Sequence, residues 1–150
     1  MKQLKVDAIK NGTVIDHIPA GKALNVYEIL SPKTKKVTTI GMNLTSKTHG
    51  RKDLIKIEGL EISTRVVNRI SLIAPSATLI IIRNFEIFKK SEVKIPKTVI
   101  NAVKCPNIKC ITNYEIIETK FIKEIANKEE TLRCSYCERV FKISEFKLQE

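Results

Sequence analysis

The chain has 150 residues, of which 43% are hydrophobic, and a formal net charge of +11. This length is typical of one domain or two small ones. The longest aliphatic run, Leu79–Ile82, is far shorter than the roughly 20 apolar residues of a transmembrane helix, so no membrane partner is expected. Residues 1–5 have neither the apolar core nor the cleavage site of a secretory signal, and we therefore expect a cytoplasmic protein.

The positive charge is concentrated in the first two thirds of the chain. Residues 1–97 carry 18 Lys and Arg against 8 Asp and Glu, whereas residues 98–150 carry 9 against 8. A basic surface attracts a polyphosphate, a polynucleotide or an acidic protein surface. The charge of the N-terminal part is thus compatible with such a partner, and part of it serves solubility, whereas the near-neutral C-terminal part is not expected to bind nucleic acid.

The first elements follow from alternation and turn residues. Apolar and charged residues alternate over residues 2–9, which predicts a strand, and residues 13–15 predict a second, short extended segment. A helix is predicted over residues 20–30, where Ser31-Pro32 would end it. Residues 36–43 and 52–58 then predict a pair of strands joined by a polar loop.

A second helix is predicted after Gly59, with Ser63 near its start and Ala74-Pro75 at its end. Strands over residues 77–83 and 85–88 complete the order β-α-β-β-α-β. This order is that of the ferredoxin-like sandwich, in which two helices lie on one face of an antiparallel sheet. The fold class predicted for the N-terminal part is therefore α+β.

A linker is predicted at residues 94–97, so that residues 1–97 and 98–150 form two domains. Short strands are expected in the second domain over residues 99–103, 114–117, 121–125 and 140–146. With about 50 residues, such a small all-β domain has too little core to fold without help from a metal ion or disulfides.

All four cysteines of the chain lie in this second part, in the pairs Cys105/Cys110 and Cys134/Cys137, with 23 residues between the pairs. Two such short loops can direct four thiolates to one tetrahedral ion. The alternatives are two disulfides, which require an oxidising compartment, and an iron ion on the same sulfurs. We favour one structural Zn²⁺ per chain, and because four sulfurs close its coordination sphere, it would perform no chemistry.

Catalytic patterns are scarce in this sequence. The only histidines are His17 and His49, and neither belongs to a zinc-protease or nucleophile motif. Asp16 and His17 are adjacent, and on an extended segment they would point to opposite faces, which argues against an acid–base pair. We expect no enzyme activity.

Instead, four polar residues are interpreted as a binding site: Asp16, His17, Lys56 and Lys90. A carboxylate suits ribose hydroxyls, and the cations suit phosphates.

Four segments carry a resemblance to a known family. They are Thr13–Pro19, Gly50–Glu58, Ala74-Pro75 with Ala77-Thr78, and Cys105-Pro106-Asn107 with Cys110-Ile111. In this order they resemble the regulatory chain of aspartate carbamoyltransferase, the allosteric subunit of the first committed enzyme of pyrimidine synthesis. The resemblance runs essentially from end to end.

The resemblance implies a function for each domain. In this family the N-terminal domain binds nucleoside triphosphates of the CTP, UTP and ATP type and forms a homodimer, and the zinc domain docks on the catalytic chain. By resemblance, the backbones of Ile9 and Phe85 would contact the base. Asp16 and Lys56 would hold the ribose and neighbouring polar edges.

The same resemblance places His17 and Lys90 at the phosphates, with Ile87 beside them. Two positions depart from the family pattern: Ile80 stands where an asparagine is frequent, and Phe85 where a tyrosine is common. The alternative functions are a zinc-ribbon nucleic-acid-binding protein and a small metal-stabilised enzyme. Few aromatic residues and the near-neutral cysteine domain argue against the first, and the closed metal site argues against the second.

Overall fold

The computed structural model describes residues 8–30, 35–48 and 50–147. The chain divides into two compact units, Met1–Lys94 and Ile95–Glu150, which are described separately. No helix in the described ranges is long and apolar enough to cross a membrane.

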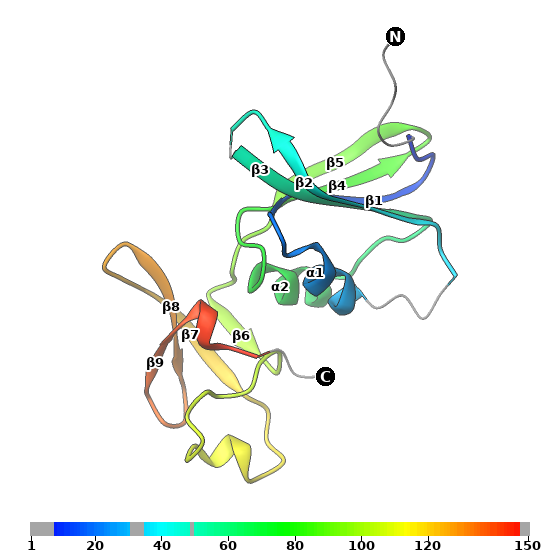
Figure 1. Ribbon diagram of the computed structural model, residues 1–150. Helices are drawn as coiled ribbons and strands as arrows, with labels where there is room; N and C mark the ends of the chain where they lie inside the picture. Colours follow the sequence, from blue (N-terminus) through cyan, green and yellow to red (C-terminus); the bar gives the residue numbers. More distant parts are fainter. Residues whose placement is uncertain (1–7, 31–34, 49, 148–150) are drawn as a thin grey trace. The chain divides into compact units, whose positions relative to one another are not determined.

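The first unit is built on a five-stranded antiparallel sheet (Figure 1). The spatial order is β2-β3-β1-β4-β5. The strands are β1 Gly12–Pro19, β2 Thr38–Ser46, β3 Gly50–Glu58, β4 Thr78–Arg83 and β5 Glu86–Glu92, and the helices are α1 Ala23–Leu30 and α2 Thr64–Ser71. Because β3 lies between β1 and β2, the first four strands and the two helices form the split β-α-β arrangement. The α+β prediction is confirmed.

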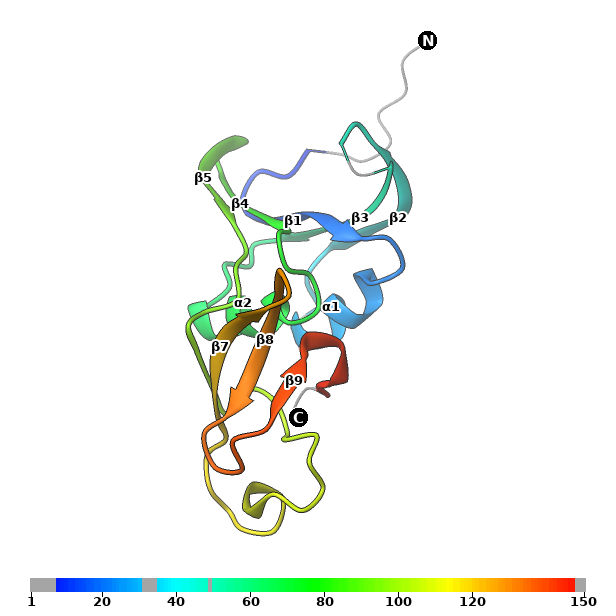
Figure 2. The same cartoon turned by 90° about the vertical axis from the view of Figure 1, so that its left-hand side faces the viewer.

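Both helices lie on the same face of the sheet, as the two views in Figures 1 and 2 show. The core between sheet and helices is almost entirely aliphatic, since Ile15, Ile55 and Ile57 from the strands and Val26 from α1 are all buried. Ser63 is the N-cap of α2, as expected from its place near the start of the predicted helix. Its hydroxyl accepts the N–H of Val66 in the first turn.

The edges of this unit differ from the sequence-based expectations. Most of the strand predicted over residues 2–9 lies outside the described residues, and its last two residues, Ala8 and Ile9, are not in a strand. The short segment predicted at 13–15 is instead the central strand β1. Strand β5 extends to Glu92 rather than ending at 88, because its register with β4 continues through polar residues that carry no apolar alternation.

The second unit contains a four-stranded antiparallel sheet in the order β6-β7-β8-β9. Its strands are β6 Thr98–Ile100, β7 Lys120–Ala126, β8 Glu129–Cys134 and β9 Val140–Lys142. Phe121 is completely buried and its ring meets that of Phe146 edge to face, with the ring centroids 5.0 Å apart. Phe146 also meets Phe141 at 5.7 Å, so three rings pack together beside the buried aliphatic residues Val103 and Leu132.

Two expectations for this unit are wrong. Residues 114–117 do not form a strand, because the chain makes a 3₁₀ turn at Ile111–Asn113 and continues irregularly. The segment predicted as a strand over 140–146 ends at Lys142 and turns into a second 3₁₀ helix, Ile143–Glu145. Strand β8 was not predicted, because Glu129, Glu130 and Arg133 leave too few apolar residues for a visible alternation.

Candidate metal centre and sheet-face site

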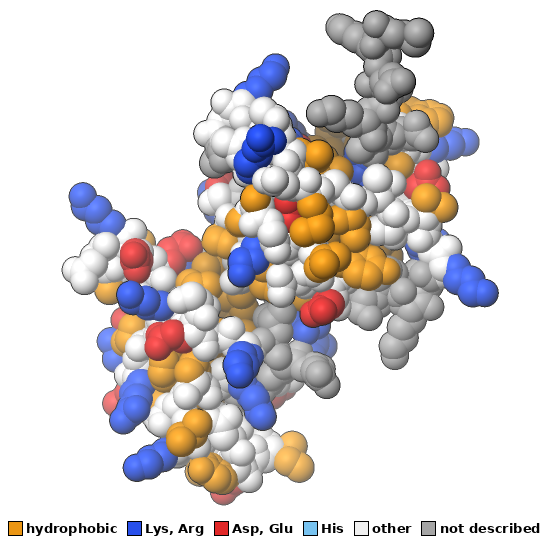
Figure 3. All heavy atoms as spheres, in the orientation of Figure 1, with side chains coloured by type: hydrophobic (Ala, Val, Ile, Leu, Met, Phe, Trp, Pro, Cys, Tyr) orange, Lys and Arg blue, Asp and Glu red, His pale blue; other side chains and the backbone are white. Residues whose placement is uncertain are grey.

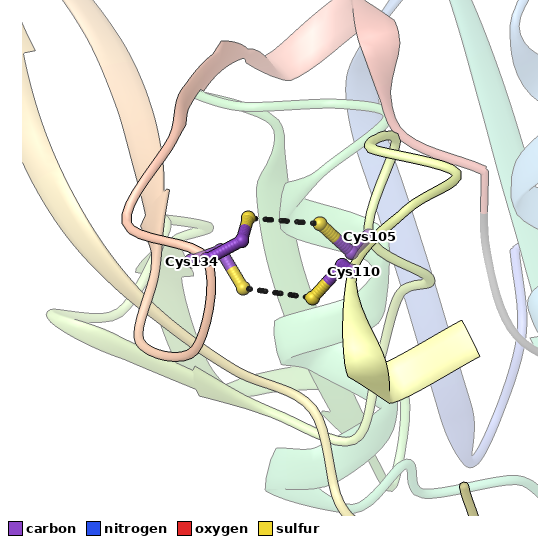
Figure 4. Close-up of side chains that lie close together, drawn as sticks. Cys105, Cys110 and Cys134 are labelled. Atoms are coloured by element: carbon purple, nitrogen blue, oxygen red, sulfur yellow. Dashed lines mark hydrogen bonds between the residues drawn. The ribbon is translucent and has the colours of Figure 1, made fainter. Parts of the chain in front are cut away.

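The four cysteines converge on one point in the second unit. Their sulfur atoms all lie within 4.8 Å of one another, and none forms a disulfide. The Sγ atoms of Cys105 and Cys137 are 3.7 Å apart and those of Cys110 and Cys134 are 3.8 Å apart (Figure 4). Four sulfurs bound tetrahedrally to zinc at about 2.3 Å lie about 3.8 Å apart, whereas a disulfide bond measures only about 2.05 Å. The spacing therefore fits a tetrahedral metal ion.

The loop that carries the first cysteine pair is fixed by short polar contacts. The side-chain amide of Asn113 donates to the carbonyl oxygens of Cys105, at 3.1 Å, and Asn107, at 2.8 Å. The Thr112 hydroxyl donates to the Cys110 sulfur at 3.2 Å. These contacts direct both sulfurs to the same side and supply a hydrogen bond to one ligand, as expected around a metal site.

The second pair is held by a tight turn between β8 and β9. The N–H of Glu138 donates to the carbonyl of Cys134, and the N–H of Cys134 donates to the carbonyl of Arg139, both at 2.9 Å. Glu138 adopts a left-handed backbone with φ of 62°, which brings Cys137 back towards Cys134. Arg133 is engaged by the Glu124 carboxylate at 2.6 and 3.1 Å, so it is not an isolated counter-charge for the sulfurs.

Three of these thiols differ in pKa, because burial acts on all three and hydrogen bonds outweigh its effect at only one. Burial raises the pKa of Cys105 and of Cys134. It also acts on Cys137, but hydrogen bonds from the backbone N–H of Arg139 and from Asn107 outweigh it and lower the pKa of Cys137 to about 7. A bound dication favours the thiolate at every ligand, so metal binding would release protons from the buried sulfurs. The predicted four-cysteine site is confirmed, and its donor set is that of a structural zinc.

The other candidate residues lie on the first unit, and strand register brings several of them together. Val14 of β1 is paired with Lys56 of β3 and Ile80 of β4, and Ile80 is paired in turn with Lys90 of β5. Directly opposed residues of antiparallel strands share one face of the sheet. Lys56 and Lys90 therefore lie on the same face, separated by the apolar floor of Val14 and Ile80.

This face is opposite to the one that the helices cover. The adjacent pair Ile15 and Ile55 is completely buried, as expected under α1 and α2, whereas Lys90 is exposed. Ile87 is paired with Ile82, which is paired with Gly12 two residues from Val14, so Ile87 belongs to the open face as well. Its side chain is 61% exposed.

A bulge in β1 corrects the expectation that Asp16 and His17 point to opposite faces. The register of β1 with β3 shifts between Ile15 and Ile18, and His17 takes a left-handed backbone with φ of 56°. Its N–H donates to Asp16 Oδ1 at 2.7 Å, and its ring Nδ1 lies 3.2 Å from the hydroxyl of Thr78, which is paired with Asp16. Because a bulge turns the chain locally, the two side chains lie side by side.

Sequence reasoning missed Lys52 as a member of this cluster. Its ammonium lies 2.8 Å from Asp16 Oδ1. Burial raises the pKa of Asp16, but the Lys52 ion pair and the His17 N–H together hold it below its ordinary value. The spacing of Lys52 and Lys56, four residues apart on one strand, places both lysines on the same face and was the signal that could have identified Lys52.

The remaining two candidates lie at the other end of the face. Phe85 sits in the turn between β4 and β5, where its ring is 64% exposed, and its N–H donates to the carbonyl of Lys10 at 2.9 Å. This bond ties the segment that contains buried Ile9 to the turn. From Gly12 to Asp16 the sheet spans about 13 Å at 3.3 Å per residue. The candidates thus form an elongated site with apolar groups at one end and charges along the rest.

Comparisons with known proteins agree with this division of the chain. Residues 4–94 match the family model described as the aspartate carbamoyltransferase regulatory chain, allosteric domain, and residues 97–147 match the metal binding domain of the same chain. The regulatory chain of Pyrococcus horikoshii is 48% identical over 150 residues, covering 97% of each chain.

Two other relatives with the same description match along most of their length. That of Thermococcus sibiricus is 48% identical over 139 residues, covering 93% of this chain and 92% of the relative. That of Methanococcus maripaludis is 49% identical over 138 residues, covering 92% and 93%. Since both units match in order and over almost their whole length, the chain belongs to the family of aspartate carbamoyltransferase regulatory chains.

Proposed function

We propose that this regulatory, non-catalytic chain binds a nucleoside triphosphate along the open face of its first unit and biases the activity of aspartate carbamoyltransferase catalytic chains. The observation that carries the proposal is the strand register, which aligns Lys56 and Lys90 on one face beside the cluster of Asp16 and His17. Such an elongated row of charges suits a ligand that is apolar at one end and polyanionic along the other.

Each part of the site has a chemical counterpart in a nucleotide. The exposed Phe85 and Ile87 side chains, together with Ile9, suit a base. Since the Phe85 N–H is bonded to Lys10, the Phe85 carbonyl is the backbone group that we assign to the base. Asp16 accepts hydrogen bonds from ribose hydroxyls, which is compatible with its anionic state.

The cations of the site complete the assignment. His17 and Lys90 are proposed to meet the phosphates, and Lys56 to bridge between them and the ribose. Lysine serves as a point charge here, so its contribution depends on the number of phosphates and decreases as salt increases.

The second unit offers a surface for the catalytic chain. The loop over residues 106–117, which contains Cys110 and follows Cys105, exposes four large apolar side chains, Ile108, Ile111, Tyr114 and Ile116. Figure 3 shows hydrophobic side chains at the end of this unit where Figure 1 draws the loop. Exposed apolar clusters of this kind are typical of protein interfaces. One structural zinc per chain would hold the loop in shape, so that metal removal would abolish docking.

Two further features belong to the proposal. The first unit ends in edge strands β2 and β5, which have no second strand partner among the described residues, and an edge strand suits pairing with a twin chain in a homodimer. The cysteines form no disulfide with one another, which suits the reducing cytoplasm as the location of this chain.

The mechanism is a coupling between two states of the assembly. A nucleotide can shift the balance only by the difference between its affinities for the two states. The test is to combine this chain with its cognate catalytic chain and to measure the aspartate saturation curve with and without CTP, UTP and ATP. A shift of the half-saturating aspartate concentration by at least one nucleotide supports the proposal.

The opposite outcome is equally clear. If no triphosphate shifts the curve or raises the melting temperature of this chain, the nucleotide proposal is wrong. Stabilisation by an oligonucleotide that disappears steeply with salt would favour a nucleic-acid-binding function instead. Treatment with a zinc chelator distinguishes the roles of the two units. Nucleotide binding by the first unit should survive, while the loss of zinc from the second unit should release the catalytic chains.

A further inference from the structure

Asp53 is the only charged side chain that is buried within the described ranges, and it is completely enclosed. Its Oδ2 accepts the N–H groups of Gly21, at 2.8 Å, and Ala23, at 3.0 Å, which open helix α1. Its Oδ1 accepts the N–H of Asn43 in β2 at 2.8 Å. One carboxylate thus connects three elements: its own strand β3, the start of α1 and the edge strand β2.

The position of Asp53 in the sheet is unusual because two bulges face the same stretch of β3. Strand β1 shifts register between Ile15 and Ile18, and Ile18 is paired with Asp53. On the other side of β3, strand β2 shifts register between Gly41 and Leu44, so that Asn43, with φ of 57°, has no ladder partner. Bulged residues lose their regular sheet hydrogen bonds, and Asp53 replaces one of them.

The residue before Asp53 belongs to the candidate nucleotide site. Lys52 pairs with Asp16 at 2.8 Å, and Asp16 in turn accepts the N–H of His17. A ligand that competes for Lys52 or Asp16 therefore breaks an ion pair made by the residue next to Asp53 on β3. The next contacts along that backbone are the Asp53 bonds to α1 and β2.

We propose that Asp53 is a positioning residue that transmits the binding of a nucleotide at the site of Asp16, Lys56 and Lys90 to helix α1 and to the edge strand β2. This inference rests on the proposed nucleotide function. The carboxylate is suited to the role because both of its oxygens only accept hydrogen bonds, and all three groups that face it are donors. An amide at this position would turn an NH₂ group towards one of those N–H groups and leave it without an acceptor.

The test uses the assembled enzyme and hydrogen exchange of backbone amides. In the wild type, saturation with the nucleotide that shifts the aspartate curve most should change the exchange rate of the Asn43 amide and of Gly21 or Ala23, while a core amide such as Ile55 stays unchanged. In Asp53→Asn the Asn43 response should disappear. The nucleotide-induced shift of half-saturating aspartate should fall below about threefold, against the 5–150-fold range that is typical of allosteric coupling.

A purely structural role gives a different pattern. If Asp53→Asn weakens nucleotide binding, measured by calorimetry, and the aspartate shift in parallel, Asp53 only supports the fold and the inference is wrong. The inference requires that the dissociation constant of the nucleotide changes much less than the aspartate shift. Wild-type exchange at Asn43 that does not respond to a bound nucleotide also overturns it.

A second variant covers the case in which Asp53→Asn does not fold. Lys52→Met keeps all three Asp53 bonds and interrupts the connection on the side of the ligand. At a nucleotide concentration that calorimetry shows to saturate this variant, the Asn43 amide should exchange as in the nucleotide-free wild type; a retained response contradicts the inference. Failure of the wild type to bind any triphosphate would instead overturn the proposed function, so the two failures are distinguishable.

Discussion

The two sites of this chain are opposite in construction. The metal centre uses four identical donors, three of them buried, with sulfur distances of 3.7 and 3.8 Å set by tight turns. The sheet-face site spreads chemically different side chains over several strands, and Phe85 and Ile87 at one end are mostly exposed. A ligand that belongs to the fold can be enclosed permanently. An effector that must enter and leave needs an open surface, and its binding groups must already be fixed in place.

The two units also differ in what stabilises them. The first unit has an aliphatic core between a sheet and two helices. The second unit has three aromatic rings and the cysteine cluster, and a core of that size rarely suffices alone. The following experiments test this contrast, from the largest expected effect to the smallest.

Cys110→Ser should cause the largest change. A serine hydroxyl is a poor zinc ligand, and zinc contributes about 10–16 kcal/mol to the folding of small domains that depend on it. We expect loss of the metal and unfolding of the second unit, while the first unit remains folded. Bound zinc and amide NMR dispersion of each unit measure this.

The matched control for that variant is Thr112→Val, which keeps all four sulfurs and removes only the hydrogen bond to Cys110. It should retain zinc and lose about 1 kcal/mol of stability. If Cys110→Ser binds zinc stoichiometrically and remains folded, the metal is not the support of this unit.

Phe121→Ala removes the completely buried ring of the second unit and should cost about 3–5 kcal/mol. Ile18→Ala, at an equally buried position of the first unit, should cost about 2–5 kcal/mol. Because zinc contributes more than either loss, Phe121→Ala should leave the zinc-loaded second unit folded, whereas Ile18→Ala removes a larger share of the stability of the first unit and should increase its exchange more. Hydrogen exchange resolved by unit provides the measurement, and equal damage in both units would remove the proposed contrast.

Lys90→Met should weaken triphosphate binding by about 1 kcal/mol, roughly fivefold, which is the interaction of two unit charges about 4 Å apart in bulk water. Monophosphate binding should change less. The control is Lys89→Met, because Lys89 is paired with Ile81 and so lies on the other face of β5. Calorimetry at fixed ionic strength distinguishes the two. Equal losses would mean that only net charge matters and that the face assignment is wrong.

Glu138→Gly should stabilise the turn of the second cysteine pair by about 0.5 kcal/mol. A left-handed backbone costs a non-glycine residue about 1–2 kcal/mol, and the greater freedom of glycine in the unfolded chain offsets part of that gain. Resistance of the zinc to a chelator is the measurement. Glu129→Gly, in the regular part of β8, should have the opposite sign.

Lys52→Met should raise the pKa of Asp16, since the ion pair that lowers it disappears and the effect of burial remains. In the wild type the lowered pKa means that Asp16 stabilises the fold above the unfolded-state value, about 3.9, and that this contribution disappears as the pH falls further. In the variant this contribution should be smaller, because the folded-state pKa moves up towards or past the unfolded-state value. Carboxyl NMR titration measures the shift, and Lys89→Met should leave it unchanged.

Much of the architecture could be predicted because it depends on local patterns. The position of Ser63 as a cap and the breaks at Ala74-Pro75 were sufficient to place α2. Strand β8 and the end of β5 could not be predicted in the same way, because they are held by neighbouring strands rather than by their own apolar alternation. A strand at the edge or in a small sheet takes its conformation from its partner.

The two sites also differ in how far local sequence patterns can predict them. The positions of the cysteines along the chain determined the metal site, because two short loops leave few other ways to place four thiols. The partnership of Asp16 with Lys52, and the alignment of Lys56 with Lys90 across β1 and β4, depend on register and on a bulge. Lys56 and Lys90, 34 positions apart in the sequence, come onto one face only when the sheet has formed, so only the tertiary structure decided which charges share a face.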